Sequence, residues 1–223
     1  MNMNGLSLDP LVNALLEGDQ VKAVSTAKEL REQGIAVDSI ITNGLEVAMT
    51  RLDNKCTIEQ FNLLEIMLVG RASMAVIKEL YPSDAIPPLT KGVVVIGSLE
   101  GDIHDLGKNI LKMVLTAQGY RVIDCGKDCP VDTLIDHAER GGALAIGVSG
   151  LITTIIPQIK QIKHMLVERG LHRIKILAGG AALKQAAASQ LNVDYVAETA
   201  FDGSHYLEHM RSAHQCSGGE REL

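Results

Sequence analysis

Apolar residues recur every three or four positions through the first third of the chain, which is the spacing of amphipathic helices. Leu11, Leu15 and Leu16 follow Asp9-Pro10, a pair that suits a helix N-terminus, with Asp as the N-cap and Pro at the first helical position. The pattern predicts one helix that begins near residue 9 and three more over about residues 19–33, 38–54 and 57–80.

The last of these predicted helices differs from the others because residues 66–70, at its middle, are apolar on all sides. A helix with that pattern is buried all round. It is either the central helix of a bundle or a helix covered by something besides its neighbours. Met67 lies in this run and Met74 follows it, and methionine at helical spacing is more often plain core than a ligand contact.

The composition changes near residue 85. The stretch 82–91, PSDAIPPLTK, contains three prolines, which exclude a helix and favour an extended connection. We therefore expect a helical domain over residues 1–84, a linker over 85–91, a second domain over 92–213 and a flexible tail over 214–223.

In the second domain, short apolar runs alternate with helical periodicity. Such alternation predicts an α/β fold, with a parallel sheet covered by helices on both faces. Ligands of these folds lie beyond the carboxyl ends of the strands, and the loops after the first, third and fourth strands carry unusual small or polar residues. The predicted strands are 93–96, 121–124, 144–148, 175–178 and 195–197, and the helices are 105–118, 131–140, 154–168, 183–190 and 203–211.

Charge and composition exclude several classes of partner. A net charge of -6 without a long basic run argues against nucleic acid. No apolar stretch is long enough for a membrane span and no signal peptide is evident, so we expect no membrane partner and a cytoplasmic location. Four scattered cysteines suit a reducing compartment, and Cys125 with Cys129 are better explained as ordinary thiols than as a zinc site.

The loop after the first predicted strand reads GSLEGDIHDLGKN and contains His104. A histidine on a loop is usually a solvated side chain, but this one lies at the ligand edge. Neutral imidazole is a good transition-metal ligand, and a carboxylate such as Asp102 on its other nitrogen would fix the tautomer. Gly107 would let a bulky group pass close to the backbone. Phosphate binding is the main alternative, although the loop matches neither common phosphate-binding glycine motif.

The other two loops read GVSGLITT from residue 147 and AGGAA from residue 178. Each alone is explained equally well by turn chemistry. Together the three loops resemble the signature of cobalamin-binding proteins, in the order Asp102-x-His104-x-x-Gly107, Ser149-x-Leu151 and Gly179-Gly180. The segment GDIHDLGKNI is especially similar to the cobalamin domain of methionine synthase. The chain also resembles the corrinoid proteins of methyltransferase and O-demethylase systems, and the resemblance covers nearly its whole length.

This resemblance implies a fold, a cofactor and a set of contacts. The fold would be a four-helix bundle cap followed by a flavodoxin-like (Rossmann-like) parallel-sheet domain. The cofactor would be cobalamin, in its methylcobalamin and Co(I) forms, with His104 as the lower cobalt ligand and Asp102 as its proton-coupled partner. The contacts implied are Gly101, Asp102, Ile103, His104, Asp105 and Gly107 near the cobalt; Ser149, Leu151, Thr153, Gly179 and Gly180 around the buried nucleotide tail; Thr199 and Ala200 over that tail; and Met67 and Met74 in the cap.

The function implied is that of a methyl carrier. A substrate-specific methyltransferase would supply the methyl group from an aryl methyl ether, methanol or a methylamine, an acceptor-side methyltransferase would pass it to tetrahydrofolate or a thiol, and a reductive activase would rescue Co(II). The chain departs from methionine synthase at Ile155, where a serine extends the His-Asp relay, so the methyltransferase carriers are the nearer expectation. A cobalamin-binding sensor, a mutase subunit and a nucleotide- or flavin-binding module are the alternatives.

Overall fold

The structure is a computed structural model that describes residues 7–56, 62–81 and 91–217, with side chains described as far as residue 212. Its residues form two compact units, one mainly helical and one built on a β-sheet, and each is described by itself. The described helices include none that is long and apolar enough to cross a membrane.

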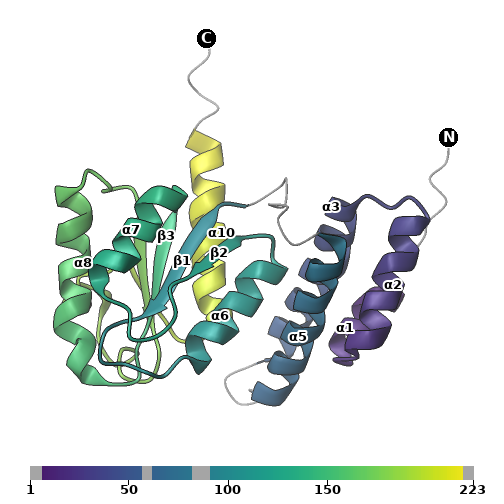
Figure 1. Cartoon of the computed structure of the whole chain (residues 1–223), viewed down its shortest axis with the longest axis horizontal. Coiled ribbons are helices and arrows are strands. Elements are labelled where there is room, and N and C mark those ends of the chain that lie inside the picture. Colours follow the sequence, from purple (N-terminus) through teal and green to yellow (C-terminus); the bar gives the residue numbers. More distant parts are fainter. Residues whose placement is uncertain (1–6, 57–61, 82–90, 218–223) are drawn as a thin grey trace, which may run out of the picture. The chain divides into compact units, whose positions relative to one another are not determined.

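The helical unit contains four helical segments, as the periodicity predicts (Figure 1). Two of them begin at side-chain caps: the Asp19 carboxylate accepts the Lys22 amide at 3.0 Å, and the Asn62 side chain accepts the Glu65 amide at 3.2 Å. The segments are α1 (Asp9–Leu16), α2 (Gln20–Glu32), a continuous stretch of α3 (Val37–Ile40), the π-helical turn η1 (Ile41–Leu45) and α4 (Glu46–Lys55), and finally α5 (Leu63–Leu80).

Two expectations about these helices are wrong, and a third concerns residues outside those that the structure describes. Asp9 is the first helical residue of α1 and not its cap. The predicted start of the fourth helix at residue 57 lies outside the described residues, and the described helix begins at Leu63. The apolar run 66–70 in α5 is not buried all round, because Ile66 packs in the core while Leu68 remains 37% exposed. Residues of the run that point away from the helical core therefore stay on the surface.

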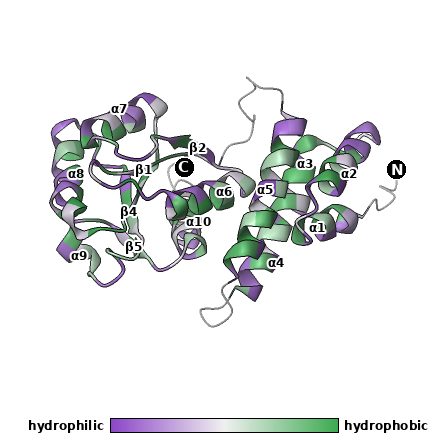
Figure 2. Ribbon diagram, turned by 60° about the horizontal axis from the view of Figure 1, so that its bottom comes forward, coloured by the Kyte–Doolittle hydropathy of each residue, from purple (hydrophilic) through white to green (hydrophobic). Residues whose placement is uncertain are grey.

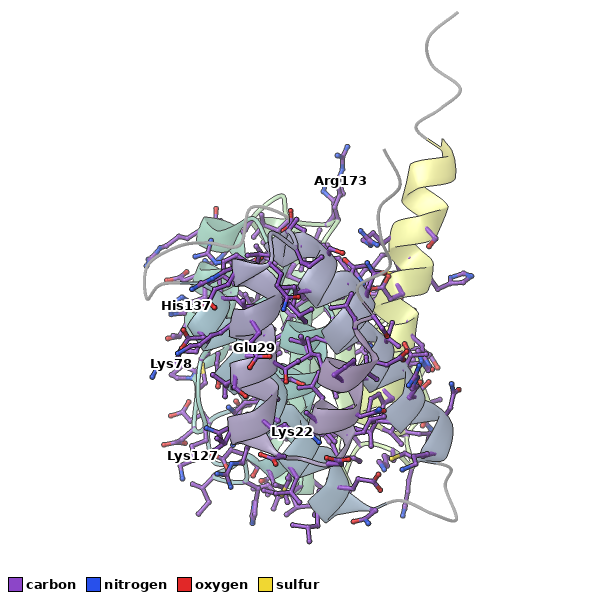
Figure 3. All side chains as sticks on the ribbon, turned by 90° about the vertical axis from the view of Figure 1, so that its right-hand side faces the viewer. Lys22, Glu29, Lys78, Lys127, His137 and Arg173 are labelled. Atoms are coloured by element: carbon purple, nitrogen blue, oxygen red, sulfur yellow. The ribbon has the colours of Figure 1, made fainter. Side chains whose placement is uncertain are left out.

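The core of the helical unit comes from the inner faces of these segments. Apolar side chains from α1, α2 and α5 are fully buried there, which is the physical basis of the bundle. Charged side chains such as Lys22, Glu29 and Lys78 are exposed on the outer faces (Figure 3). The chain thus buries one stripe of each helix, as the amphipathic pattern requires.

The second unit is a five-stranded sheet in the order β2-β1-β3-β4-β5. Hydrophobic residues concentrate on the strands and the inner faces of the helices (Figure 2). Helices α7 and α8 lie on one side of the sheet and α6 and α10 on the other (Figure 1). The elements are β1 (Val93–Ser98), α6 (Leu106–Ala117), β2 (Arg121–Asp124), α7 (Val131–Gly141), β3 (Ala145–Ser149), the 3₁₀ turn η2 (Thr153–Ile155), α8 (Ile156–Glu168), β4 (Lys175–Gly179), α9 (Ala188–Leu191), β5 (Tyr195–Ala197) and α10 (Ala200–Ser217).

The strand order confirms the flavodoxin-like, Rossmann-like α/β class. From β1 the chain crosses to β2 on one side and then to β3, β4 and β5 on the other, so the crossovers diverge between β1 and β3. In doubly wound sheets that divergence opens a crevice at the carboxyl ends of the two strands. The fold therefore places the ligand edge at the ends of β1 and β3.

Candidate functional site

The carboxyl edge of the sheet ends in a row of small residues. Strand register pairs Ser98 with Ser149, Ser149 with Gly179, and Gly179 with Ala197. The loops that the sequence singled out therefore leave the sheet at one level, along its lower edge in Figure 1. In this row Ser98 is buried, and Ser149, Gly179 and Ala197 are partly exposed.

A hydrogen bond between His104 and Asp102 is the polar centre of this edge. The Asp102 Oδ1 atom lies 2.8 Å from the imidazole Nδ1 and accepts the His104 backbone amide at 2.9 Å. Its Oδ2 atom accepts the backbone amide of Leu151 at 2.7 Å. The Asp102 side chain is fully buried, whereas the His104 side chain is 49% exposed. The carboxylate thus joins the loop after β1 to the loop after β3, next to a partly exposed imidazole.

These contacts determine which nitrogen of His104 can bind a ligand. Burial by itself raises the pKa of Asp102, but the hydrogen bonds from Leu151 and His104 together lower it below its ordinary value. An ionised carboxylate only accepts hydrogen bonds, so Nδ1 carries the proton. In the neutral ring the Nε2 lone pair then remains for a metal or a proton.

The turn before His104 is held by its own backbone and by β1. The buried Ser98 hydroxyl donates to the His104 carbonyl at 2.8 Å, and the Asp102 amide donates to the Leu99 carbonyl at 2.9 Å. Gly101 has a φ of +90°, which a residue with a side chain rarely adopts. Sequence reasoning missed Ser98, although its position at the end of β1 was a signal for it.

The tail-binding residues predicted from the resemblance lie around the same edge. The Ser149 hydroxyl lies 3.1 Å from where a Cβ on Gly107 would be, so the segments that follow β1 and β3 approach each other closely. A Cβ on Gly180, whose φ is +101°, would lie 2.4 Å from the Gly150 carbonyl oxygen. Leu151 is 48% exposed and Ile103 is 64% exposed, so apolar surface flanks the imidazole. Thr153, Asp105 and Gly179 lie in or beside these loops.

Two further sets of predicted residues lie at the start of α10, just beyond the carboxyl end of β5, and on α5 of the helical unit. The Thr199 hydroxyl accepts the Asp202 amide at 3.0 Å, which makes Thr199 a cap for α10, with Ala200 as its first residue. Met67 and Met74 are half-buried on α5 of the helical unit. Their contact with a cofactor stays a prediction, as does that of Thr199 and Ala200.

The cysteines agree with ordinary thiols. Cys56, Cys125 and Cys129 are free, and burial raises the pKa of Cys125 to about 12, so it is protonated at neutral pH. In residues 7–56, 62–81 and 91–212 no group of three or more His, Cys, Asp or Glu could hold a metal ion by itself. A metal bound through the single imidazole of His104 would have to bring its other ligands with it.

Comparisons with known proteins identify the cofactor. Residues 92–204 match the family model of a B12 binding domain, and residues 7–81 match a second model of the same description. The chain belongs to the B12-binding corrinoid proteins. It accordingly binds cobalamin, and the partly exposed imidazole of His104 at a glycine-rich edge fits that cofactor.

Relatives of this corrinoid protein have names that mention methylated substrates. It is 34% identical to a dimethylamine corrinoid protein of Methanosarcina mazei over 80% of this chain and 85% of the relative. It is 35% identical to a corrinoid protein of Desulfitobacterium hafniense over 87% of this chain and 93% of the relative. Among solved structures, it resembles the methanol:cobalamin methyltransferase complex of Methanosarcina barkeri with a TM-score of 0.81 and 28% identity, over 92% of this chain and 79% of that one.

Proposed function

We propose that this corrinoid protein carries methyl groups between two partner methyltransferases, with His104 as the lower ligand of its cobalt. The Asp102–His104 pair is the observation that carries this proposal, because the carboxylate engages Nδ1 and Nε2 is therefore the ring nitrogen left for a metal at the ligand edge of the sheet. The names of the relatives support a donor such as a methylamine or methanol. An aryl methyl ether as donor, tetrahydrofolate or a thiol as acceptor, and a reductive activase as third partner belong to the same proposal.

When bound, cobalamin supplies a cobalt centre that can accept and release a methyl group. The chain's own residues orient and tune it. Asp102 keeps the proton on Nδ1 of His104 and raises the basicity of Nε2. Should His104 leave the metal, its Nε2 can take up a proton, and the charge of Asp102 stabilises the resulting imidazolium. The pair therefore couples metal ligation to proton uptake at Nε2 of His104.

Gly107, Gly179 and Gly180 have the complementary role of admitting the nucleotide tail. Gly179 keeps its part of the edge free of a side chain, whereas Gly107 and Gly180 let the loop that carries Ser149 and Gly150 pass close to them. The Ser149 hydroxyl and the apolar surface of Leu151 suit a base and a ribose. This role extends the cobalt proposal, since a tail held away from the metal leaves the lower position to His104.

The carrier role is tested by following a labelled methyl group. The full chain is loaded with hydroxocobalamin, reduced, and treated with deuterated methyl iodide, which replaces the donor-side methyltransferase. We expect the visible spectrum to change and the label to stay with the protein through gel filtration. It should leave only when tetrahydrofolate or a thiol is added together with an acceptor-side methyltransferase.

Two outcomes would count against the proposal in different ways. A chain that stays colourless with every corrinoid would contradict cofactor binding itself. A loaded chain whose label reaches no acceptor in the presence of any acceptor-side methyltransferase would instead favour a cobalamin-binding sensor.

A further inference from the structure

The loop between β2 and α7 runs alongside the turn that carries Asp102. The Ser98 amide donates to the Gly126 carbonyl at 3.0 Å, the Cys129 amide donates to the Ser98 carbonyl at 2.9 Å, and the Glu100 amide donates to the Cys129 carbonyl at 3.0 Å. These backbone bonds extend the sheet-like pairing of the two segments beyond the ends of the strands. They end one residue short of Gly101.

Asp128 makes the contacts beyond that point. Its Oδ1 atom accepts the Gly101 amide at 2.7 Å, and its own amide donates to the Asp102 carbonyl at 3.1 Å. The residue therefore holds the Gly101 amide with its side chain and the Asp102 carbonyl with its backbone. Asp102 in turn holds the Nδ1 atom of His104.

The backbone of Asp128 supports a specific role. Its φ is +55°, and among the described residues Asn192 is the one other non-glycine residue with a positive φ. Asn192 has an ordinary reason for it, because it ends helix α9. Asp128 ends no helix, and a left-handed conformation costs a residue with a side chain about 1 kcal/mol or more. That conformation places its amide and its carboxylate on the same turn.

Packing does not hold Gly101, the residue of the turn that Asp128 contacts. A Cβ on Gly101 would have no atom within 4 Å, so no neighbouring side chain presses on the turn there. Asp128 is itself exposed and contributes nothing to the apolar core. Hydrogen bonds therefore fix Gly101, and the acceptor oxygen of Asp128 supplies the one to its amide.

We propose that Asp128 is a positioning residue that fixes the Asp102–His104 pair for cobalt, an inference that rests on the proposed function. Its action passes from its carboxylate to the Gly101 amide, and from there through the Asp102 carboxylate to the imidazole. Losing this contact loosens the turn and lowers the fraction of loaded protein in which His104 binds the metal.

Three substitutions separate the hydrogen bond from the backbone strain. Asp128→Asn keeps an acceptor oxygen and tolerates a left-handed φ, so it retains the wild-type behaviour. Asp128→Gly keeps the conformation and removes the acceptor. Asp128→Ala removes the acceptor and adds strain. Lys127→Ala is the matched control, because Lys127 is the exposed neighbour in the same loop (Figure 3).

The readout is the ratio of His-ligated to unligated cobalt(II), measured by electron paramagnetic resonance on the full chain loaded with cobalamin. We expect Asp128→Gly and Asp128→Ala to lower this ratio roughly threefold to tenfold, the effect of losing one backbone-to-carboxylate hydrogen bond. Asp128→Asn and Lys127→Ala should match the wild type. The thermal midpoint of each apo variant is measured in parallel.

The outcomes distinguish this inference from the proposed function. A wild-type ratio in Asp128→Gly overturns the role of Asp128 alone, and a loss confined to Asp128→Ala does so too, since strain would explain it. Benzimidazole ligation in the wild type overturns the proposed function with it. If the glycine variant does not fold, hydrogen exchange on the wild-type apo protein decides: a Gly101 amide that exchanges as fast as an unprotected one refutes the contact.

Discussion

At the scale of single residues, His104 is defined by what its two nitrogens can do. Nδ1 faces a buried carboxylate that also accepts hydrogen bonds from the backbone amides of His104 and Leu151. Each of these groups acts as a donor. Asn in place of Asp102 could not satisfy this set, since its NH₂ group would face a donor in either orientation. The ionised carboxylate is therefore what fixes the ring with Nε2 free to bind.

This geometry predicts how nitrogen-15 labelling changes the electron paramagnetic resonance spectrum of the cobalamin-loaded protein. Protein labelled with nitrogen-15 only in histidine and loaded with unlabelled cobalamin should show, in the cobalt(II) state, the hyperfine splitting of nitrogen-15. The splitting should disappear in His104→Ala. The control is His164→Ala, because that imidazole is also exposed, at 74%, and also lies beside a carboxylate, with its Nε2 3.2 Å from Glu168 Oε1.

If the labelled wild type still shows the splitting of nitrogen-14, the benzimidazole of the vitamin is still bound to the metal. His104 would then be a surface residue with a structural partner. Equal loss of signal in the His164 variant would point to general damage and contradict a specific role for His104.

At the scale of elements, the two glycines that end β4 are not equivalent. A Cβ on Gly179 would lie 3.4 Å from the Ala197 carbonyl oxygen and 3.8 Å from the Ala197 Cβ, both ordinary contacts. A Cβ on Gly180 would overlap the Gly150 carbonyl oxygen at 2.4 Å, on a residue with a φ of +101°. Gly180 is therefore required by the fold, whereas Gly179 is free to serve a ligand.

We accordingly predict that Gly180→Ala destabilises the protein by about 3 kcal/mol, the combined effect of a left-handed φ and a backbone clash. Gly179→Ala should stay within about 1 kcal/mol of the wild type. Its cobalamin affinity should nevertheless fall, because the added methyl group would occupy the edge at which we propose that the tail binds. Urea unfolding of the apo proteins measures the first effect and a binding titration measures the second.

Unchanged affinity in a folded Gly179→Ala protein would argue against a tail at this edge. A Gly180→Ala protein as stable as the wild type would contradict the close approach of the β4 and β3 loops.

The sequence was sufficient for the elements that periodicity and buried runs define. All five predicted strands are present and begin within one residue of their expected starts, since apolar runs between turn residues leave little choice of position. The predicted helix over 183–190 is wrong: only Ala188–Leu191 is helical, because successive turns from Gly180 carry Leu183 into the core. Helix α10 is longer than predicted, since Thr199 caps it earlier.

The site divides in the same way. A motif can indicate His104, Asp102 and the glycines, because their residue types are unusual at strand ends. It cannot indicate Asp128, which an ordinary exposed loop contributes and which matters through a left-handed φ and a contact 27 positions away. Nor could it show that the Leu151 amide, 49 positions away, donates to the Asp102 carboxylate. Contacts between distant segments depend on the folded backbone.

At the scale of the whole molecule, lowered carboxyl pKa values link stability to pH. Burial raises the pKa of Asp102 and of Asp124, but hydrogen bonds to each outweigh it and lower both below the ordinary value. In Asp124 the main partner is Lys108, which is 3% exposed and lies 2.6 Å away. Both carboxylates belong to the sheet unit. In the helical unit the pKa of Asp9 is also lowered, chiefly by Ser7, but on the surface, where solvent screens its charge.

A carboxyl whose pKa is lower in the folded state stabilises the fold above the pKa of the unfolded chain, about pH 4, and loses that contribution as the pH falls through the folded value. We therefore predict that acidification below about pH 4 opens the sheet unit before the helical unit. Hydrogen exchange with mass spectrometry on the full apo chain resolves the two units at each pH.

Asp102→Asn should be less stable than the wild type at pH 7 by about 1 to 3 kcal/mol, the effect of one unsatisfied buried donor. That difference should shrink in acid, where the wild-type carboxyl is protonated too. A constant difference across the range, or a helical unit that opens first, would show that these buried carboxylates do not control the acid response of the molecule.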